Sequence, residues 1–336
     1  MGKRIYYLDL IKFFAIYIVI LGHAIQYIGK GFWHNPLWEL IYSFHMALFM
    51  IMSGYFFSSS MKLSAGAFFK KKSVQLLLPA VAWYSFLCLV YSFINPGLEE
   101  ENIMKFDMHG LVNSFWFLKC VFGCYFIARI SLKLIKNEFL AAIISSVVLC
   151  IVPFGSLVAI NFLLPFFWIG LFYKKYREKI EKDASLWWGA SLALFIFCLA
   201  CWEGSYTIYK SPIELFSFHP FHFATATFGI ALFRFLIGLA GSAFFIISVQ
   251  MLYERYANRQ WISKCCEIGK YTLGIYIIQM ILFERVFMLL SLRLDDWLVY
   301  LLAPGLSLAI LALCLTIIKT IERNSYSRFL LLGTPR

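Results

Sequence analysis

The sequence predicts an all-α polytopic membrane protein. Three observations support this fold class: the composition, the long apolar runs and the placement of basic residues. Hydrophobic residues make up 62% of the chain and charged residues only 14%, whereas a soluble domain has about 25% charged residues. Because unpaired backbone groups are costly in lipid, and because the apolar runs are too long for barrel strands, we expect the spans to be helices.

Ten apolar runs are each close to the roughly 20 residues that a helix needs to cross the hydrocarbon core. They lie near residues 5–29, 37–58, 73–94, 111–132, 138–157, 159–173, 185–203, 225–252, 269–291 and 297–320. The sixth run is short and the eighth is long. We therefore expect about ten transmembrane helices in one integral-membrane domain over residues 1–336, with no fused soluble domain.

Basic residues are concentrated in segments that alternate with the predicted spans. Six segments hold 22 of the 30 Lys and Arg residues: 1–4, 59–72, 129–137, 174–184, 253–270 and 319–336. Segments on the other side carry acidic residues instead, including Glu99–Glu101 and Asp295–Asp296. The positive-inside rule then predicts that both termini lie in the cytoplasm and that the number of spans is even. The net charge of +12 indicates contact with anionic lipids and not with nucleic acid.

The first apolar run carries three ionisable residues, Asp9, Lys12 and His23. Such a side chain costs about 2.5–3.5 kcal/mol in a spanning helix, so each is a candidate functional residue. The eleven residues from Lys12 to His23 make three helical turns, which predicts that both side chains share one face about 16 Å apart. Asp9 lies three residues before Lys12 and can balance its charge. A neutral imidazole at His23 can accept a proton from a hydroxyl; the alternative is a histidine that only bonds between helices.

Other polar residues near the spans allow two interpretations each. Lys70, Lys71 and Lys72 precede the third run, with Gln75 one turn further, and either anchor the inner surface or attract a cytosolic phosphate. His45 lies within the second run, where it either packs between helices or takes part in catalysis. The nine cysteines show no zinc-ligand spacing, so no metal site is expected.

Four motifs in order resemble those of acyltransferase family 3, the polytopic bacterial O-acyltransferases that modify surface glycans. They are LDLIKFFAIYIVILGH with Asp9, Lys12 and His23, FHMALFMIMSGYFF with His45, Ser53 and Gly54, FWFL around Trp116, and IGKYTLGIYIIQ with Gly269, Thr272, Leu273 and Tyr276. The resemblance runs along most of the chain. On composition alone, Trp116 would instead be an aromatic residue of the membrane interface.

Two positions depart from the family pattern. The family commonly has two arginines, three residues apart, before a proline at the third helix. Counted from Pro79, those positions here hold Lys72 and Gln75, so one charge is kept and one is lost. We expect the two lysines before Lys72 to compensate. The family also often has histidine where this chain has Gln279.

The resemblance implies an O-acyltransferase of the bacterial inner membrane. It would move an acyl group, expected to be acetyl, from cytosolic acetyl-CoA to a hydroxyl of a surface or lipid-linked carbohydrate. In this interpretation His23 is the general base, Asp9 orients or balances Lys12, and Lys70–Lys72 with Gln75 bind the CoA phosphates. An acyl-histidine relay is an alternative. Cavity-lining residues are expected to be His45, Ser53, Trp116 and Tyr276.

Two other function classes fit the same composition. A transporter or flippase for a lipid-linked sugar also needs about ten helices and buried polar residues, but it would consume no CoA. A structural partner in a polysaccharide-export complex would tolerate His23→Ala. The shared face of Lys12 and His23, together with the basic cluster on one side of the membrane, favours the enzyme.

Overall fold

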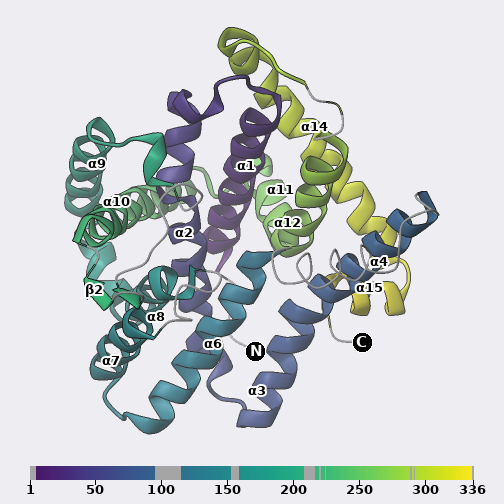
Figure 1. The fold of residues 1–336 in the computed structure, drawn as a ribbon. Coiled ribbons are helices and arrows are strands. Elements are labelled where there is room, and N and C mark those ends of the chain that lie inside the picture. Colours follow the sequence, from purple (N-terminus) through teal and green to yellow (C-terminus); the bar gives the residue numbers. More distant parts are fainter. Residues whose placement is uncertain are drawn as a thin grey trace.

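The structure is a computed structural model that describes residues 5–94, 115–152, 159–207, 216–218, 221–223, 225–287, 290 and 292–334. The described chain is a bundle of helices with one two-stranded hairpin (Figure 1). Glu99–Glu101, one of the acidic segments of the predicted orientation, lie outside the described residues.

The described residues form twenty elements. In chain order they are α1 (Tyr6–Ile28), η1 (Phe32–His34), α2 (Pro36–Ser60), α3 (Ala65–Lys72), the π turn η2 (Ser73–Leu77), α4 (Leu78–Ile94), α6 (Trp116–Leu134), α7 (Glu138–Ile151), α8 (Ile160–Lys182), α9 (Ala184–Ala200), η4 (Gly204–Tyr206), β1 (Phe216–Phe218), β2 (Phe221–Phe223), α10 (Thr225–Tyr256), α11 (Gln260–Ile268), η5 (Gly269–Tyr271), α12 (Thr272–Ile281), the π turn η6 (Leu282–Phe287), α14 (Asp296–Glu322) and α15 (Ser325–Leu332). The two strands pair antiparallel.

Asparagine side chains start three of the described helices. Asn35, Asn137 and Asn324 each accept hydrogen bonds from the first backbone N–H groups of α2, α7 and α15. These N–H groups have no partner within the helix, so a side-chain oxygen at this position stabilises the helix start. Pro36 follows Asn35 at the first position of α2, where its missing N–H costs nothing.

Each of the ten predicted runs contains a helix, and several are long and apolar enough to cross a membrane. Within the described residues, six helical segments meet that test alone: Tyr6–Ile28, Pro36–Ser60, Ala65–Val90, Thr227–Tyr256, Gln260–Phe287 and Asp296–Glu322. Helices α8 and α9 meet it together, although they are bent by 110° relative to each other. Helix α7 has only 14 residues, and α6 carries three basic residues within 19. The chain is therefore an all-α polytopic membrane protein, while the number ten stays a prediction.

The third span begins earlier than the sequence indicated. Lys70–Lys72 do not precede a helix but form the last turn of α3, which continues without a break through η2 into α4. Ser64 starts this helix by accepting a bond from Ala67 N. Pro79 has no N–H to donate to an earlier carbonyl, and the wider turn of η2 lies immediately before it. The lysines and Gln75 therefore lie on one continuous helical rod.

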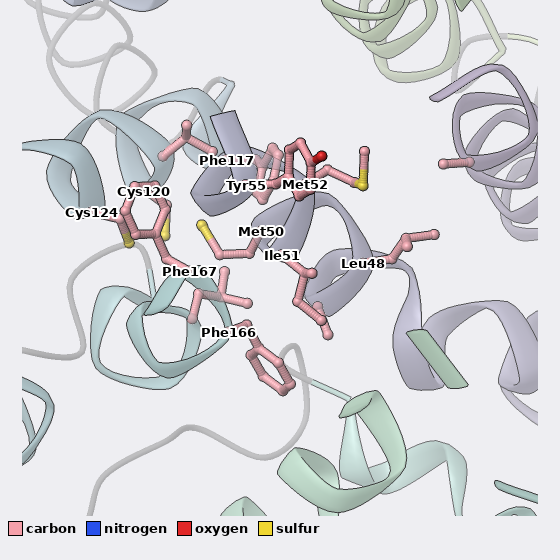
Figure 2. Packing of buried hydrophobic residues seen from close by; sticks show 14 of the residues in the cluster. Leu48, Met50, Ile51, Met52, Tyr55, Phe117, Cys120, Cys124, Phe166 and Phe167 are labelled. Carbon is pink, nitrogen blue, oxygen red and sulfur yellow. The ribbon is translucent and has the colours of Figure 1, made fainter. Parts of the chain in front are cut away.

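Helices α2 and α8 form the closest pair in the core. A Cβ atom on Gly54 would lie 1.8 Å from the carbonyl oxygen of Phe167, and one on Gly170 would lie 1.9 Å from that of Ile51. Small residues allow such close backbone approach in membrane helices. Side chains of α2, α6 and α8, including Ile51, Cys124 and Phe167, fill the space beside this contact (Figure 2).

Replacing Gly54 with leucine is expected to destabilise the protein by about 1–3 kcal/mol or more, because the new side chain overlaps backbone atoms that cannot move independently. Thermal unfolding of the detergent-purified protein measures this effect. Gly189→Leu on α9 is the matched control, since nothing lies within 4 Å of its Cβ position. Equal melting temperatures for the two variants would contradict the close packing of α2 and α8.

Helix α1 lies in the middle of the bundle, where α2, α10, α11, α12 and α14 pack around it (Figure 1). Asp9 and His23 are both buried. At its beginning, α1 touches the backbone of η5, because a Cβ atom on Gly269 would lie 2.0 Å from the carbonyl oxygen of Asp9. The central position of α1 turns its polar residues toward neighbouring helices.

Candidate active site

A cavity of about 470 Å³ lies among α1, α2, α6, the α3–η2 rod and the η5–α12 segment. Most of the residues predicted from the sequence line it. They are Lys12, His23, His45, Ser53, Lys71, Lys72, Gln75, Trp116 and Tyr276. Asp9 does not line the cavity but pairs with Lys12, and Lys70 lines a second cavity. The fold therefore brings together residues from four separate motifs.

His23 lines this cavity. Among the described residues, its imidazole forms one hydrogen bond, through Nδ1. Its Nδ1 lies 2.8 Å from Oε1 of Gln279. The amide nitrogen of Gln279 donates to the carbonyl of Tyr276 at 3.3 Å, so its oxygen faces the imidazole. Nδ1 must then carry the proton of the neutral ring, which leaves the lone pair on Nε2. This tautomer is the one that a general base requires if it acts through Nε2.

His45 is a second imidazole in the same wall. Its Nδ1 donates to the carbonyl oxygen of Ile41 at 2.8 Å, one turn earlier in α2. The lone pair of its neutral ring is therefore also on Nε2. The Tyr42 ring contacts both histidines, with centroid distances of 6.3 Å to His23 and 4.7 Å to His45. The site thus contains two imidazoles in the same tautomer, both buried.

Lys12 is a paired cation toward the start of α1. Its Nζ lies 2.7 Å from Oδ1 of Asp9, as the spacing of three residues predicted. The ammonium group also lies 4.9 Å from the centroid of the Phe56 ring. The Asp9 side chain is only 10% exposed and that of Lys12 25%. The pair places a balanced charge in the cavity wall three turns from His23.

Lys72 is a cation of a different kind, because it is 5% exposed and lies beside neutral groups. Its Nζ lies 3.7 Å from the centroid of the Tyr125 ring and 3.5 Å from Oε1 of Gln75. Among the described residues, no carboxylate forms an ion pair with it. Burying a charge is costly unless an opposite charge compensates it. The surroundings of Lys72 therefore favour binding of an anion in the cavity.

A second cavity, of about 1090 Å³, adjoins the first. Lys71, Gln75, Lys270 and Leu273 line both, so the two spaces meet at these residues. Lys70 lines only the second cavity. The predicted basic cluster is thus divided: Lys72 faces the first space, Lys70 the second, and Lys71 both.

Three residues of this region were not predicted as site residues. Gln279 fixes the tautomer of His23, Tyr125 lies against Lys72, and Lys270 lines both cavities. Gln279 had a detectable signal, because a lone amide in the apolar stretch IYIIQMI needs a partner. The other two had none: Tyr125 is one of 19 tyrosines in the chain, and a lysine near a helix end, such as Lys270, is a common membrane-interface residue.

The described residues contain no group of three or more His, Cys, Asp and Glu placed to hold a metal ion. What they contain is a proton acceptor at one part of a largely apolar cavity and cations at another. Such an arrangement can hold an anionic molecule by one end and deprotonate a hydroxyl at the other.

Gln279→Leu is expected to lower kcat about threefold to tenfold, because losing one neutral buried hydrogen bond frees the His23 ring to turn or to change tautomer. Gln279→Glu keeps an acceptor oxygen toward Nδ1 and is expected to retain more activity than the leucine variant. The measurement is kcat for both variants at saturating donor. Full activity in Gln279→Leu would show that the amide does not position His23.

Comparison with known proteins identifies the family. A family model described as an acyltransferase domain matches residues 5–319. Nodulation protein NolL of Sinorhizobium fredii (strain NBRC 101917 / NGR234) is 23% identical, over 98% of this chain and 92% of that protein. Nodulation protein NolL of Mesorhizobium japonicum (strain LMG 29417 / CECT 9101 / MAFF 303099) is 24% identical, over 97% of this chain and 90% of that protein. No solved structure matches the chain. The chain belongs to acyltransferase family 3 and is an acyltransferase that transfers groups other than aminoacyl groups.

Proposed function

We propose that this protein moves an acyl group, in the first instance acetyl, from cytosolic acyl-CoA to a hydroxyl of a cell-surface or lipid-linked carbohydrate. One observation carries the proposal: a single cavity contains both the Nε2-basic imidazole of His23 and the buried cation Lys72. An acyl-CoA needs both features: the base activates the hydroxyl that attacks its thioester end, and the cation binds its phosphate end.

In the proposed reaction, Nε2 of His23 takes the proton of the acceptor hydroxyl as its oxygen attacks the thioester carbonyl. The new C–O bond forms, the C–S bond breaks, and the imidazolium returns its proton to the departing CoA sulfur. Gln279 keeps Nδ1 protonated throughout. An acyl-histidine relay is the variant in which Nε2 itself attacks the carbonyl and the hydroxyl then accepts the acyl group.

The donor is proposed to enter from the side of the basic residues. Lys71 and Lys72, on the α3–η2 rod, attract the phosphates of CoA, and Lys12 lines the same cavity three helical turns before His23 on α1. Asp9 balances Lys12, so this part of the wall is polar without excess charge. His45, Ser53, Trp116 and Tyr276 complete the wall around the thioester and the acceptor.

The membrane arrangement proposed with this function has about ten spans, one membrane domain over residues 1–336 and both termini in the cytoplasm of a bacterial inner membrane. The start of α1 and helix α15 lie at the end of the bundle that also holds α3, which supports termini on one side (Figure 1). That end is the basic one, as the positive-inside rule requires of the cytoplasmic side.

Incubation of the detergent-purified protein with acetyl-CoA labelled in the acetyl group tests the proposal. We expect release of CoA that depends on a carbohydrate acceptor, or slow hydrolysis without one. Label retained on the protein would select the acyl-histidine relay. If no CoA is released with any glycan fraction while a lipid-linked sugar is moved across vesicles, the chain is the alternative, a transporter or flippase.

A further inference from the structure

The second cavity is larger than the one around His23, and the chemistry of His23 does not use it. It lies between the α3–η2 rod, the η5–α12 segment and the pair α14–α15. We propose that it binds the adenosine 3′,5′-bisphosphate end of acyl-CoA and that Lys270 is one of its phosphate ligands. This inference rests on the proposed function, because it assigns the carrier end of the same donor.

The position and size of the cavity fit this part of the molecule. Its volume of about 1090 Å³ exceeds the 470 Å³ of the space around His23. The two spaces share Lys71, Gln75, Lys270 and Leu273, so one extended ligand can occupy both. The nucleotide is the bulky end of acyl-CoA and the pantetheine arm is the narrow one. The wide space therefore suits the nucleotide and the narrow one the thioester.

The wall of the second cavity is predominantly basic. Lys70, Lys71 and Lys270 line it, against one acidic residue, Glu322. Glu322 already accepts a hydrogen bond from the hydroxyl of Tyr271 at 3.3 Å. Lys270 pairs with Glu267 at 2.7 Å, but both side chains are partly exposed, at 39% and 61%. Exposed pairs of this kind contribute little, so the Lys270 ammonium can also contact a phosphate.

Helix α15 gives this cavity a fixed wall. The Trp83 indole donates to the carbonyl oxygen of Leu331 at 3.0 Å, which attaches the end of α15 to α4. Gly333 follows with φ +62, and a Cβ atom there would lie 2.5 Å from the carbonyl oxygen of Val74. The rings of Tyr271 and Phe329 also line the space. Aromatic faces are the usual surface against which a nucleotide base stacks.

Protection from amine labelling tests the site without relying on catalysis. The full chain in detergent is treated with an amine-reactive ester, and each lysine is quantified by mass spectrometry. Adenosine 3′,5′-bisphosphate at about five dissociation constants is expected to slow labelling of Lys270 about sixfold. Lys264, exposed on α11 and in neither cavity, is the control and should react as before. No protection of Lys270 overturns the proposal, and so does protection by phosphatidylglycerol but not by the nucleotide.

Kinetics separate this inference from the proposed function. S-acetylpantetheine carries the same thioester as acetyl-CoA but no nucleotide. Lys270→Ala is expected to lower the ratio of kcat/KM for acetyl-CoA to that for S-acetylpantetheine about tenfold, whereas Lys264→Ala leaves the ratio unchanged. An unchanged ratio in Lys270→Ala overturns the nucleotide site while acyl transfer stands. If the nucleotide protects Lys270 but neither thioester is turned over, the nucleotide site stands and the proposed acyl transfer is overturned.

Discussion

Replacing His23 with alanine is expected to lower the rate of acyl transfer by about 10²–10⁴-fold, the usual contribution of a positioned general base. The reason is geometric. The hydrogen bond from Nδ1 to Gln279 leaves Nε2 as the basic atom of His23, and the imidazole lines the same cavity as Lys71 and Lys72. The measurement is acceptor-dependent release of CoA from acetyl-CoA by the purified protein.

His34→Ala is the matched control for His23→Ala, because His34 is exposed in η1 and lines none of the cavities described here. Binding of CoA should survive in the His23 variant, because the lysines proposed to bind its phosphates belong to the α3–η2 rod and to η5 and not to α1. A His23→Ala protein that melts normally, binds CoA and still transfers the acyl group to the acceptor used in the assay at the wild-type rate would refute the general-base assignment. His45, with its own basic Nε2, would then be the next residue to test.

Much of the fold and part of the site could be predicted from sequence because lipid imposes strong rules. Spanning helices must be apolar and about 20 residues long, so each predicted run contains a helix. Ionisable residues within spanning helices must pair with another polar group or face a cavity, because exposing them to lipid is costly. Lys12 therefore finds Asp9 three residues earlier, and both Lys12 and His23 line one cavity. Helical periodicity alone is enough to place these residues on one face.

What the sequence could not supply is contact between distant segments. Gln279 lies 256 residues from His23, and no local pattern joins an amide in α12 to an imidazole in α1. The length of the third helix was also missed, because Ala65–Lys72 is too polar to read as part of a span although its backbone continues into η2. The wall formed by α15 depends on the contact of Gly333 with Val74, which no periodicity encodes.

These distant contacts divide the lysine cluster into side chains of different character. Lys70 and Lys71 are exposed at the cavity edge, where water stabilises their charge. Lys72 is buried, and among the described residues its ammonium group contacts the ring face of Tyr125 and the amide oxygen of Gln75. An attraction of roughly 0.5–2 kcal/mol to an aromatic ring does not match the several kcal/mol that full desolvation of an ammonium costs. Lys72 is therefore expected to reduce stability without a ligand and to favour binding of an anion.

Lys72→Met separates these two effects. The methionine keeps most of the volume and removes the charge. We expect KM for acetyl-CoA to rise about 10- to 150-fold, the loss of a charge-assisted bond to phosphate, with a smaller fall in kcat. The melting temperature of the ligand-free protein is expected to stay the same or to rise, because a buried cation that forms no ion pair among the described residues has been removed. Steady-state kinetics and thermal unfolding in one detergent measure both quantities.

Lys133→Met, on the exposed surface of α6, removes the same charge outside both cavities and should change neither quantity. Added CoA should raise the melting temperature of the wild-type protein and of this control. It should raise that of Lys72→Met much less, because at a given concentration a more weakly bound ligand stabilises the folded state less. If Lys72→Met melts well below the wild type and binds CoA normally, the ammonium is a structural partner of Tyr125 and not a phosphate ligand. Unchanged stability with a raised KM would show instead that Lys72 contributes to binding of acetyl-CoA and not to the stability of the fold.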